Sequence, residues 1–145
     1  MKKTALFMLI LMNLSVYASE TDVSVEDAWL RAAPPGAHML AAYATVVNQG
    51  DGPIDLVGAD SEAFGMTEIH RTVEVDGVFK MKEQKRLAIG AGDSLSMNPG
   101  GLHIMLMKPK QSLDVGDTVD ITLQFEDSDG ETWSQQLSFE VKRER

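Results

Sequence analysis

Four residues near the middle of the chain carry the side chains best suited to binding chemistry. His70, Met81, His103 and Met105 are spaced as H-x10-M-x21-H-x-M. Two imidazoles and two thioethers are soft donors, which favour Cu(I) over divalent zinc, calcium or magnesium. The chain has no cysteine, so histidine and methionine supply its only soft ligands. Spacing alone leaves two interpretations open: the four residues meet at one ion, or they are separate packing residues.

The segment 102–107 is the clearest predicted strand. Side chains of a strand alternate between two faces, so its three aliphatic residues share one face, which we expect in the core. His103, Met105 and Met107 then point the other way. His103 and Met105 lie about 7 Å apart along the strand, and two long side chains at that distance can converge on one ion.

Short runs with β-forming composition recur between turn signals along the rest of the chain, while helical periodicity is weak. The hairpin turn Asp76-Gly77 joins two of these runs and favours positive φ. Their number and spacing predict an all-β antiparallel sandwich or barrel, whose strand order the pattern leaves open. The predicted strands are residues 23–31, 40–48, 54–59, 67–75, 78–82, 86–89, 94–97, 102–107, 118–125 and 132–141.

The first eighteen residues predict a cleaved signal peptide. Lys2 and Lys3 precede an apolar run over 4–16, and Val16-Tyr17-Ala18 offers a cleavage site. The run is shorter than the ~20 residues that span a bilayer, and no cysteine follows that could carry a lipid, so we expect no membrane anchor. Residues 19–145 are therefore expected to form a single exported, periplasmic domain.

Charge and composition narrow the function classes. A formal net charge of −9 makes nucleic acid a poor partner. The absence of cysteine excludes thiol redox chemistry, thiolate zinc sites and a blue-copper centre. Three histidines give little material for a Ser-His-Asp constellation, so we expect that the protein is not an enzyme. A metal-free β-sandwich that binds a protein partner in the cell envelope remains the alternative to a metal carrier.

The spaced residues and their surroundings resemble the PCuA(C) family of periplasmic copper chaperones, whose signature is H-x10-M-x21-H-x-M. Both long spacings are unaltered here. The resemblance covers essentially the whole predicted mature chain. Its supporting segments are Trp29-Leu30-Arg31, Pro34-Pro35, Ala41-Ala42-Tyr43, Asn48, residues 99–106 and residues 113–119.

This resemblance implies a cupredoxin-like Greek-key β-sandwich with one exposed Cu(I) site per chain. It implies His70, Met81, His103 and Met105 as the metal ligands. It also implies a carrier that delivers copper toward the CuA centre of cytochrome c oxidase, with oxidase subunit II or a thioredoxin-like copper protein as partner. We expect a monomer.

Further histidines and methionines are left outside this ligand set. Some members of the family carry a His- and Met-rich C-terminal tail that handles Cu(II); residues 139–145 contain no histidine or methionine, which puts a Cu(II) role in doubt. Contributions from His38, Met39 and Met107 are also open. Met66 and Met97 are expected to be ordinary apolar residues.

Overall fold

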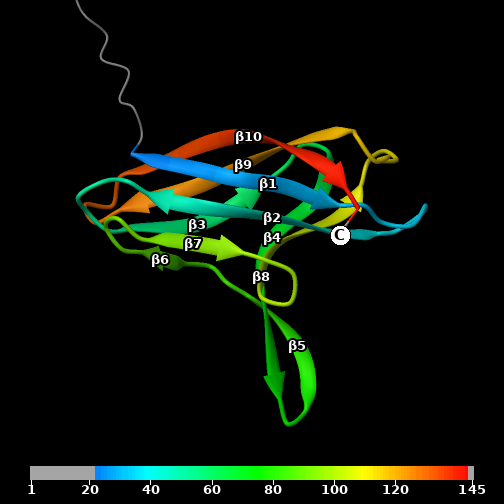
Figure 1. Cartoon of the computed structure of the whole chain (residues 1–145), viewed down its shortest axis with the longest axis horizontal. Coiled ribbons are helices and arrows are strands. Elements are labelled where there is room, and N and C mark those ends of the chain that lie inside the picture. Colours follow the sequence, from blue (N-terminus) through cyan, green and yellow to red (C-terminus); the bar gives the residue numbers. More distant parts are fainter. Residues whose placement is uncertain (1–21, 144–145) are drawn as a thin grey trace, which may run out of the picture.

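Ten strands make up the described part of the chain, residues 22–143 of a computed structural model (Figure 1). The predicted signal peptide, residues 1–18, lies outside the described residues. The strands are β1 (Val23–Arg31), β2 (Met39–Asn48), β3 (Ile54–Asp60), β4 (Phe64–Val75), β5 (Val78–Glu83), β6 (Leu87–Ile89), β7 (Ser94–Met97), β8 (Leu102–Pro109), β9 (Thr118–Asp127) and β10 (Thr132–Lys142). The all-β prediction is confirmed, and each predicted strand matches an observed one within a few residues at either end. Across residues 22–143, no helix has the length and apolar character needed to cross a membrane.

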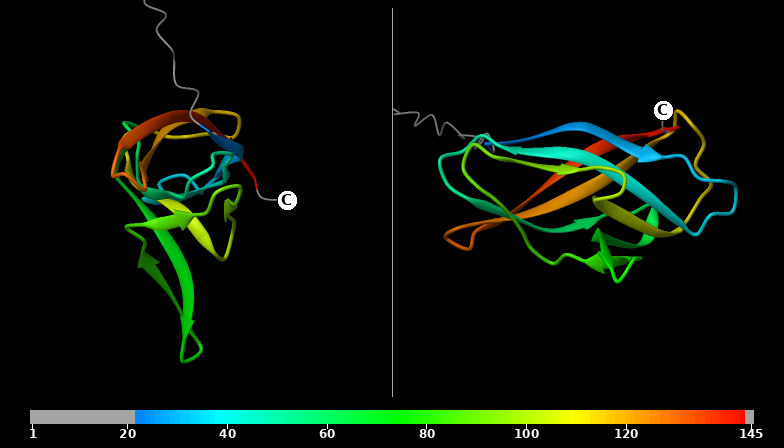
Figure 2. Two further views of the ribbon diagram at one scale, coloured as in Figure 1. Left: turned by 90° about the vertical axis from the view of Figure 1, so that its left-hand side faces the viewer. Right: turned by 60° about the horizontal axis from the view of Figure 1, so that its bottom comes forward.

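One continuous sheet connects these strands, in the order β5-β4-β8-β2-β1-β10-β9-β3-β6, and β7 pairs with β2 beside β8. Seen end-on, the sheet curls around a shared interior to give the predicted sandwich-like body (Figure 2). The strand pairs are antiparallel with one exception: β1 and β10 run parallel, with Trp29 opposite Glu140. The first and the last strand of the body are therefore neighbours near the middle of the sheet.

The interior is filled by the aliphatic and aromatic residues that alternate along the strands. On β8, the predicted core face is confirmed, because Leu102, Ile104 and Leu106 are all buried. Of the two methionines expected to be ordinary apolar residues, Met97 is only 1% exposed and fills the core, whereas Met66 is 42% exposed. Burial of alternate residues on several strands fixes which face of each strand points inward. The largest fully buried side chains include Phe125, Phe139, Leu30, Leu56, Ile89, Ile121 and Leu123.

The hairpin of β4 and β5 extends away from the body (Figure 1). β4 pairs with β8 as far as Arg71, and beyond that point it pairs only with β5. Asp76 and Gly77 close the hairpin with φ angles of 53° and 75°, which confirms the predicted positive-φ turn. Val78 and Phe79 beside the turn are exposed. The hairpin therefore holds half of its length in the sheet and presents the other half to solvent.

A buried asparagine joins the end of β2 to two neighbouring segments. The Asn48 side-chain amide donates to the carbonyl oxygens of Gly52, Ile89 and Gly90 at 2.8, 3.2 and 3.0 Å. Its side-chain oxygen accepts from the Gly50 amide at 3.0 Å. Because the residue is 1% exposed, water cannot easily replace these partners. Asn48 thus fixes the turn after β2 against β6.

Replacing Asn48 by alanine should lower the free energy of unfolding by about 2 kcal/mol or more, because it removes all four hydrogen bonds of a buried side chain. Urea denaturation followed by tryptophan fluorescence measures the change. Gln49→Ala is the matched control, since the Gln49 amide makes an exposed bond to the Ser24 hydroxyl at 3.3 Å. Equal stability of the two variants would contradict this role of Asn48.

Candidate metal centre

The pairing of three neighbouring strands brings the four spaced residues to one face of the sheet. On β4 and β8, His70 lies directly opposite His103, and Met105 lies two residues farther along β8. On β4 and β5, Thr72 lies opposite Met81, which makes Met81 a diagonal neighbour of His70. Diagonal neighbours on one face are about 7–8 Å apart, within reach of long side chains. The face therefore gathers all four residues around His70.

The two imidazoles lie next to each other in an edge-to-face arrangement, and each leaves one nitrogen without a hydrogen-bond partner. Their ring centroids are 5.9 Å apart, and the ring planes cross at 69°. His70 Nε2 lies 2.7 Å from Glu68 Oε2, and His103 Nδ1 lies 3.1 Å from the carbonyl oxygen of Gly101. Both partners accept hydrogen bonds, so these two nitrogens carry the protons of the neutral rings. His70 Nδ1 and His103 Nε2 are left as buried lone pairs without a hydrogen-bond partner.

His103 is the more enclosed of the two histidines. Its residue surface is 4% exposed, and burial lowers the pKa of its imidazole below the ordinary 6.5. The positive charges of Arg31 and of a protonated His70 also lower this pKa, while the hydrogen bond to the Gly101 carbonyl opposes the shift. The neutral form, which is the ligating form, is therefore favoured at neutral pH.

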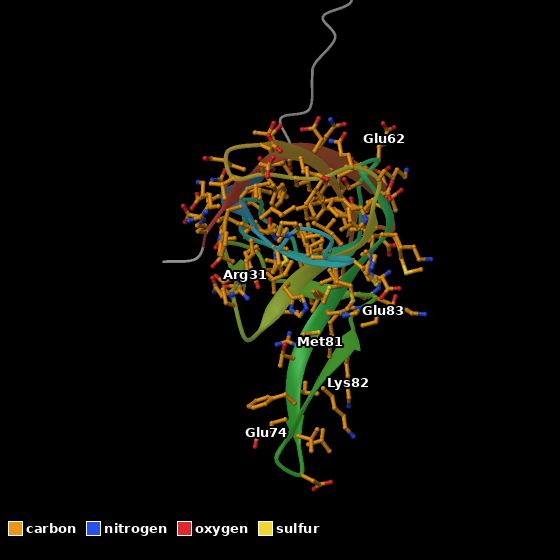
Figure 3. The ribbon with its side chains drawn as sticks, turned by 90° about the vertical axis from the view of Figure 1, so that its right-hand side faces the viewer. Arg31, Glu62, Glu74, Met81, Lys82 and Glu83 are labelled. Atoms are coloured by element: carbon orange, nitrogen blue, oxygen red, sulfur yellow. The ribbon has the colours of Figure 1, made fainter. Side chains whose placement is uncertain are left out.

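The two methionines differ sharply in exposure. Met105 is 8% exposed within the sheet, whereas Met81 is 59% exposed on the hairpin. Figure 3 shows Met81 between the body and the tip of the hairpin, where Glu74 is found. An ion at this face would be held from the β8 side by buried groups and from the β5 side by a side chain open to solvent.

This donor set fits a soft monovalent ion. No group of three or more His, Asp or Glu side chains in residues 22–143 is arranged to hold a metal ion. The other two of the four residues on this face are methionines, whose sulfur binds Cu(I) well and hard cations poorly. The residues present are thus chemically suited to Cu(I).

Two groups that position the histidines were missed by the sequence reasoning. Glu68 stands two residues before His70, and strand alternation alone places both on one face. The Gly101 carbonyl precedes His103 by two residues, and it also accepts from the Thr72 amide at 3.1 Å. Partners of this kind fix the tautomer and orientation of a ligating histidine. The alternation rule could have identified Glu68.

The other soft residues lie elsewhere on the sheet. Met107 follows Met105 on the same face of β8, and Met39 lies opposite Met107 on β2. His38 precedes β2, and its carbonyl oxygen accepts from the Lys108 amide at 2.9 Å. These residues are not neighbours of His70, so the structure gives them no place in the four-residue group.

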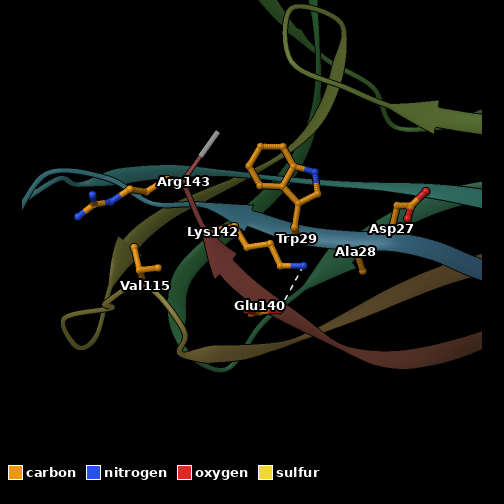
Figure 4. Close-up of a pocket in the computed structure, with 7 residues that line it drawn as sticks. All are labelled: Asp27, Ala28, Trp29, Val115, Glu140, Lys142 and Arg143. Carbon is orange, nitrogen blue, oxygen red and sulfur yellow. Dashed lines mark ion pairs between the residues drawn. The ribbon is translucent and has the colours of Figure 1, made fainter. Parts of the chain in front are cut away.

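An open hollow on the described surface is separate from this face. It is lined by residues of β1 and β10, including Trp29, Glu140 and Lys142 (Figure 4). Lys142 Nζ lies 3.1 Å from Glu140 Oε2 and forms an ion pair with it. None of the four spaced residues lines it. The four spaced residues therefore lie apart from this hollow.

Solved structures with the same fold define the class of the domain. The chain is similar to the apo PCuAC domain from PmoF1, with 27% identity and a TM-score of 0.68 over 85% of this chain and 95% of that one. It is also similar to Cu(I)-bound DR1885 from Deinococcus radiodurans, with 36% identity and a TM-score of 0.61 over 82% of this chain and 76% of that one. The domain therefore has a PCuAC-type fold.

The family follows from the sequence match. The protein family described as "Putative lipoprotein LpqE-like" matches residues 23–139 of the sequence, and the chain belongs to this LpqE-like family. A relative in Leifsonia xyli subsp. xyli (strain CTCB07), "Putative lipoprotein Lxx21020", is 43% identical over 111 residues. The match covers 76% of this chain and 64% of that relative, so the chain spans less than two thirds of the relative's length.

NMR titration of the His103 imidazole should give a midpoint below pH 6.5, because its buried environment disfavours the charged ring. A lowered folded-state pKa means that the unfolded chain binds the proton more tightly. The contribution of His103 to stability is then complete above pH 6.5 and is lost as the pH falls from 6.5 through the lowered pKa. The free energy of unfolding in urea should depend less on pH across this range in His103→Gln. An NMR titration midpoint at or above pH 6.5 would refute the expectation.

Proposed function

We propose that this protein is a Cu(I) chaperone of the cell envelope, with His70, Met81, His103 and Met105 as the ligands of one Cu(I). The observation that carries the proposal is the pair of facing imidazoles, each with a free buried nitrogen turned away from its hydrogen-bonded one. The similarity to a Cu(I)-bound solved structure at 36% identity supports it. Membership of a family described as lipoproteins supports an envelope location.

The chemistry of this ligand set suits a carrier. Thioethers have no proton to lose, and burial favours the neutral, ligating form of His103, so these three groups can bind Cu(I) near neutral pH without displacing protons. Thioethers are weaker donors than thiolates, so copper would pass downhill to a thiolate-containing acceptor. Of the proposed ligands, Met81 is the exposed one, and it is the ligand that an acceptor could replace first.

We infer that the acceptor belongs to the respiratory chain. In this proposal, copper moves toward the CuA centre of cytochrome c oxidase, either to subunit II directly or through a thioredoxin-like copper protein. The protein acts as a monomer and not as an enzyme. Exposed Phe79 precedes Met81 by two residues on the same face of β5 and offers apolar surface to a partner that approaches the ion from this side.

Replacing Met81 or Met105 by leucine should lower the Cu(I) affinity about tenfold or more, because each change removes a thioether while nearly conserving volume. Anaerobic competition with a chromophoric Cu(I) chelator measures the affinity. Met97→Leu, in the core, is the control and should leave it unchanged. Unaltered affinity in both ligand variants would overturn the assignment, and absence of bound copper in the unsubstituted protein would favour the metal-free interaction module.

Replacing Glu68 by alanine should weaken Cu(I) binding about tenfold, because His70 loses the carboxylate that holds its Nε2 proton. Glu68→Gln, which keeps an acceptor oxygen, should lose less. Glu74→Ala is the matched control, since it removes the same charge from the same face of β4 near the hairpin tip. The same chelator competition measures the Cu(I) affinity of all three variants. Equal losses of affinity in Glu68→Ala and Glu74→Ala would mean that Glu68 acts only through its long-range charge.

A further inference from the structure

Three methionines form a row across three neighbouring strands, away from the four-residue group. Met107 on β8 lies directly opposite Met39 on β2. The same Met107 lies directly opposite Met66 on β4. Directly opposite residues on one face have Cβ atoms about 4.5–5.5 Å apart. Met107 is therefore flanked on both sides by a methionine, although the three residues are distant in sequence.

This row shares its face with the candidate copper site. Met107 follows Met105 by two residues on β8, and Met66 precedes Glu68 by two residues on β4. Each step of two residues covers about 7 Å along a strand, so the methionine row lies about 7 Å from Met105. Met105 thus stands between the row and the two histidines.

Core packing does not account for the row. Met39 is 61% exposed, Met66 is exposed as well, and Met107 is half-buried. Met97, by contrast, shows what a packing methionine looks like in this protein, since it is almost completely buried. An exposed methionine leaves apolar side-chain surface in contact with water, which a polar residue at the same position would not do. Two exposed methionines in register with a third need an explanation other than burial.

The chemistry of three adjacent thioethers is specific. Methionine is unbranched and has three rotatable side-chain bonds, so the outer two side chains can bend over Met107. Three sulfurs without a thiolate or carboxylate form a neutral set that suits a soft monovalent cation and does not suit zinc, calcium or magnesium. Glu68 lies on the same face, one step from Met66, and contributes negative charge nearby.

We propose that Met39, Met66 and Met107 form a second binding site for a soft monovalent cation, Cu(I) or its analogue Ag(I), on the same face as the four-residue site. The second site is weaker than the first, because it has three thioethers and no imidazole nitrogen. It is also more open to solvent. Binding at this row is independent of the proposed function, whereas its use as a landing place from which copper moves past Met105 to the histidines rests on that function.

Titration of protein labelled with [13C-methyl]methionine tests the site, with Ag(I) as a redox-inert probe. The first equivalent should shift the methyl signals of Met81 and Met105. The second should shift Met39, Met66 and Met107 together, with a common binding curve, while buried Met97 stays unmoved. Independent curves for the three, or shifts only at large excess, would overturn the proposal.

Leucine variants provide the second measurement. Met39→Leu/Met66→Leu/Met107→Leu should bind one equivalent fewer and keep its first affinity within about threefold, because the four-residue site is intact. The double variant Met39→Leu/Met66→Leu, which changes only exposed side chains, should lose the second equivalent as well. Met97→Leu is the control and should keep both equivalents. An unchanged second equivalent in the triple variant would refute the site.

The two proposals fail separately. If Met39, Met66 and Met107 respond together but Met81 and Met105 do not, the methionine row binds the cation and the proposed chaperone site is wrong. If only Met81 and Met105 respond, the chaperone proposal stands and the second site does not exist.

Discussion

The register between β4 and β8 is the constraint on which the candidate site depends. It sets His70 opposite His103, and a slip of one residue would turn every side chain of a strand to the other face. The buried face of each strand prevents this slip, because Ile69 and Ile104 lie opposite each other in the core. The hydrophobic pattern of the interior therefore aligns the imidazoles outside it. The two histidines therefore need no further contact to bring them together.

Much of the fold could be predicted because its signals are local. Alternation along residues 102–107 correctly separated the core face from His103 and Met105, and Asp76-Gly77 correctly predicted the hairpin turn. Strand order could not be predicted, since it depends on pairings between residues far apart in the chain. The parallel pairing of β1 with β10 is of this kind.

The candidate site could also be predicted only in those features that depend on local sequence. The types and spacing of its four residues were visible in sequence, but the facing rings and the free nitrogens depend on the β4–β8 pairing. The position of Met66 opposite Met107 could not be predicted, because it depends on the pairing of β4 with β8. Glu68 was missed although alternation places it beside His70. The failures therefore concern neighbours across strands more than residues along one strand.

The parallel pairing of β1 with β10 has a consequence for how the domain folds. The two strands lie side by side near the middle of the sheet, yet β10 is the last strand to be synthesised. Contacts between such distant segments form slowly, because a long loop must close first. The sheet cannot become continuous until β10 has emerged, because β10 joins β1 to β9. The interior that the two halves of the sheet share is therefore closed only by the last of the described strands.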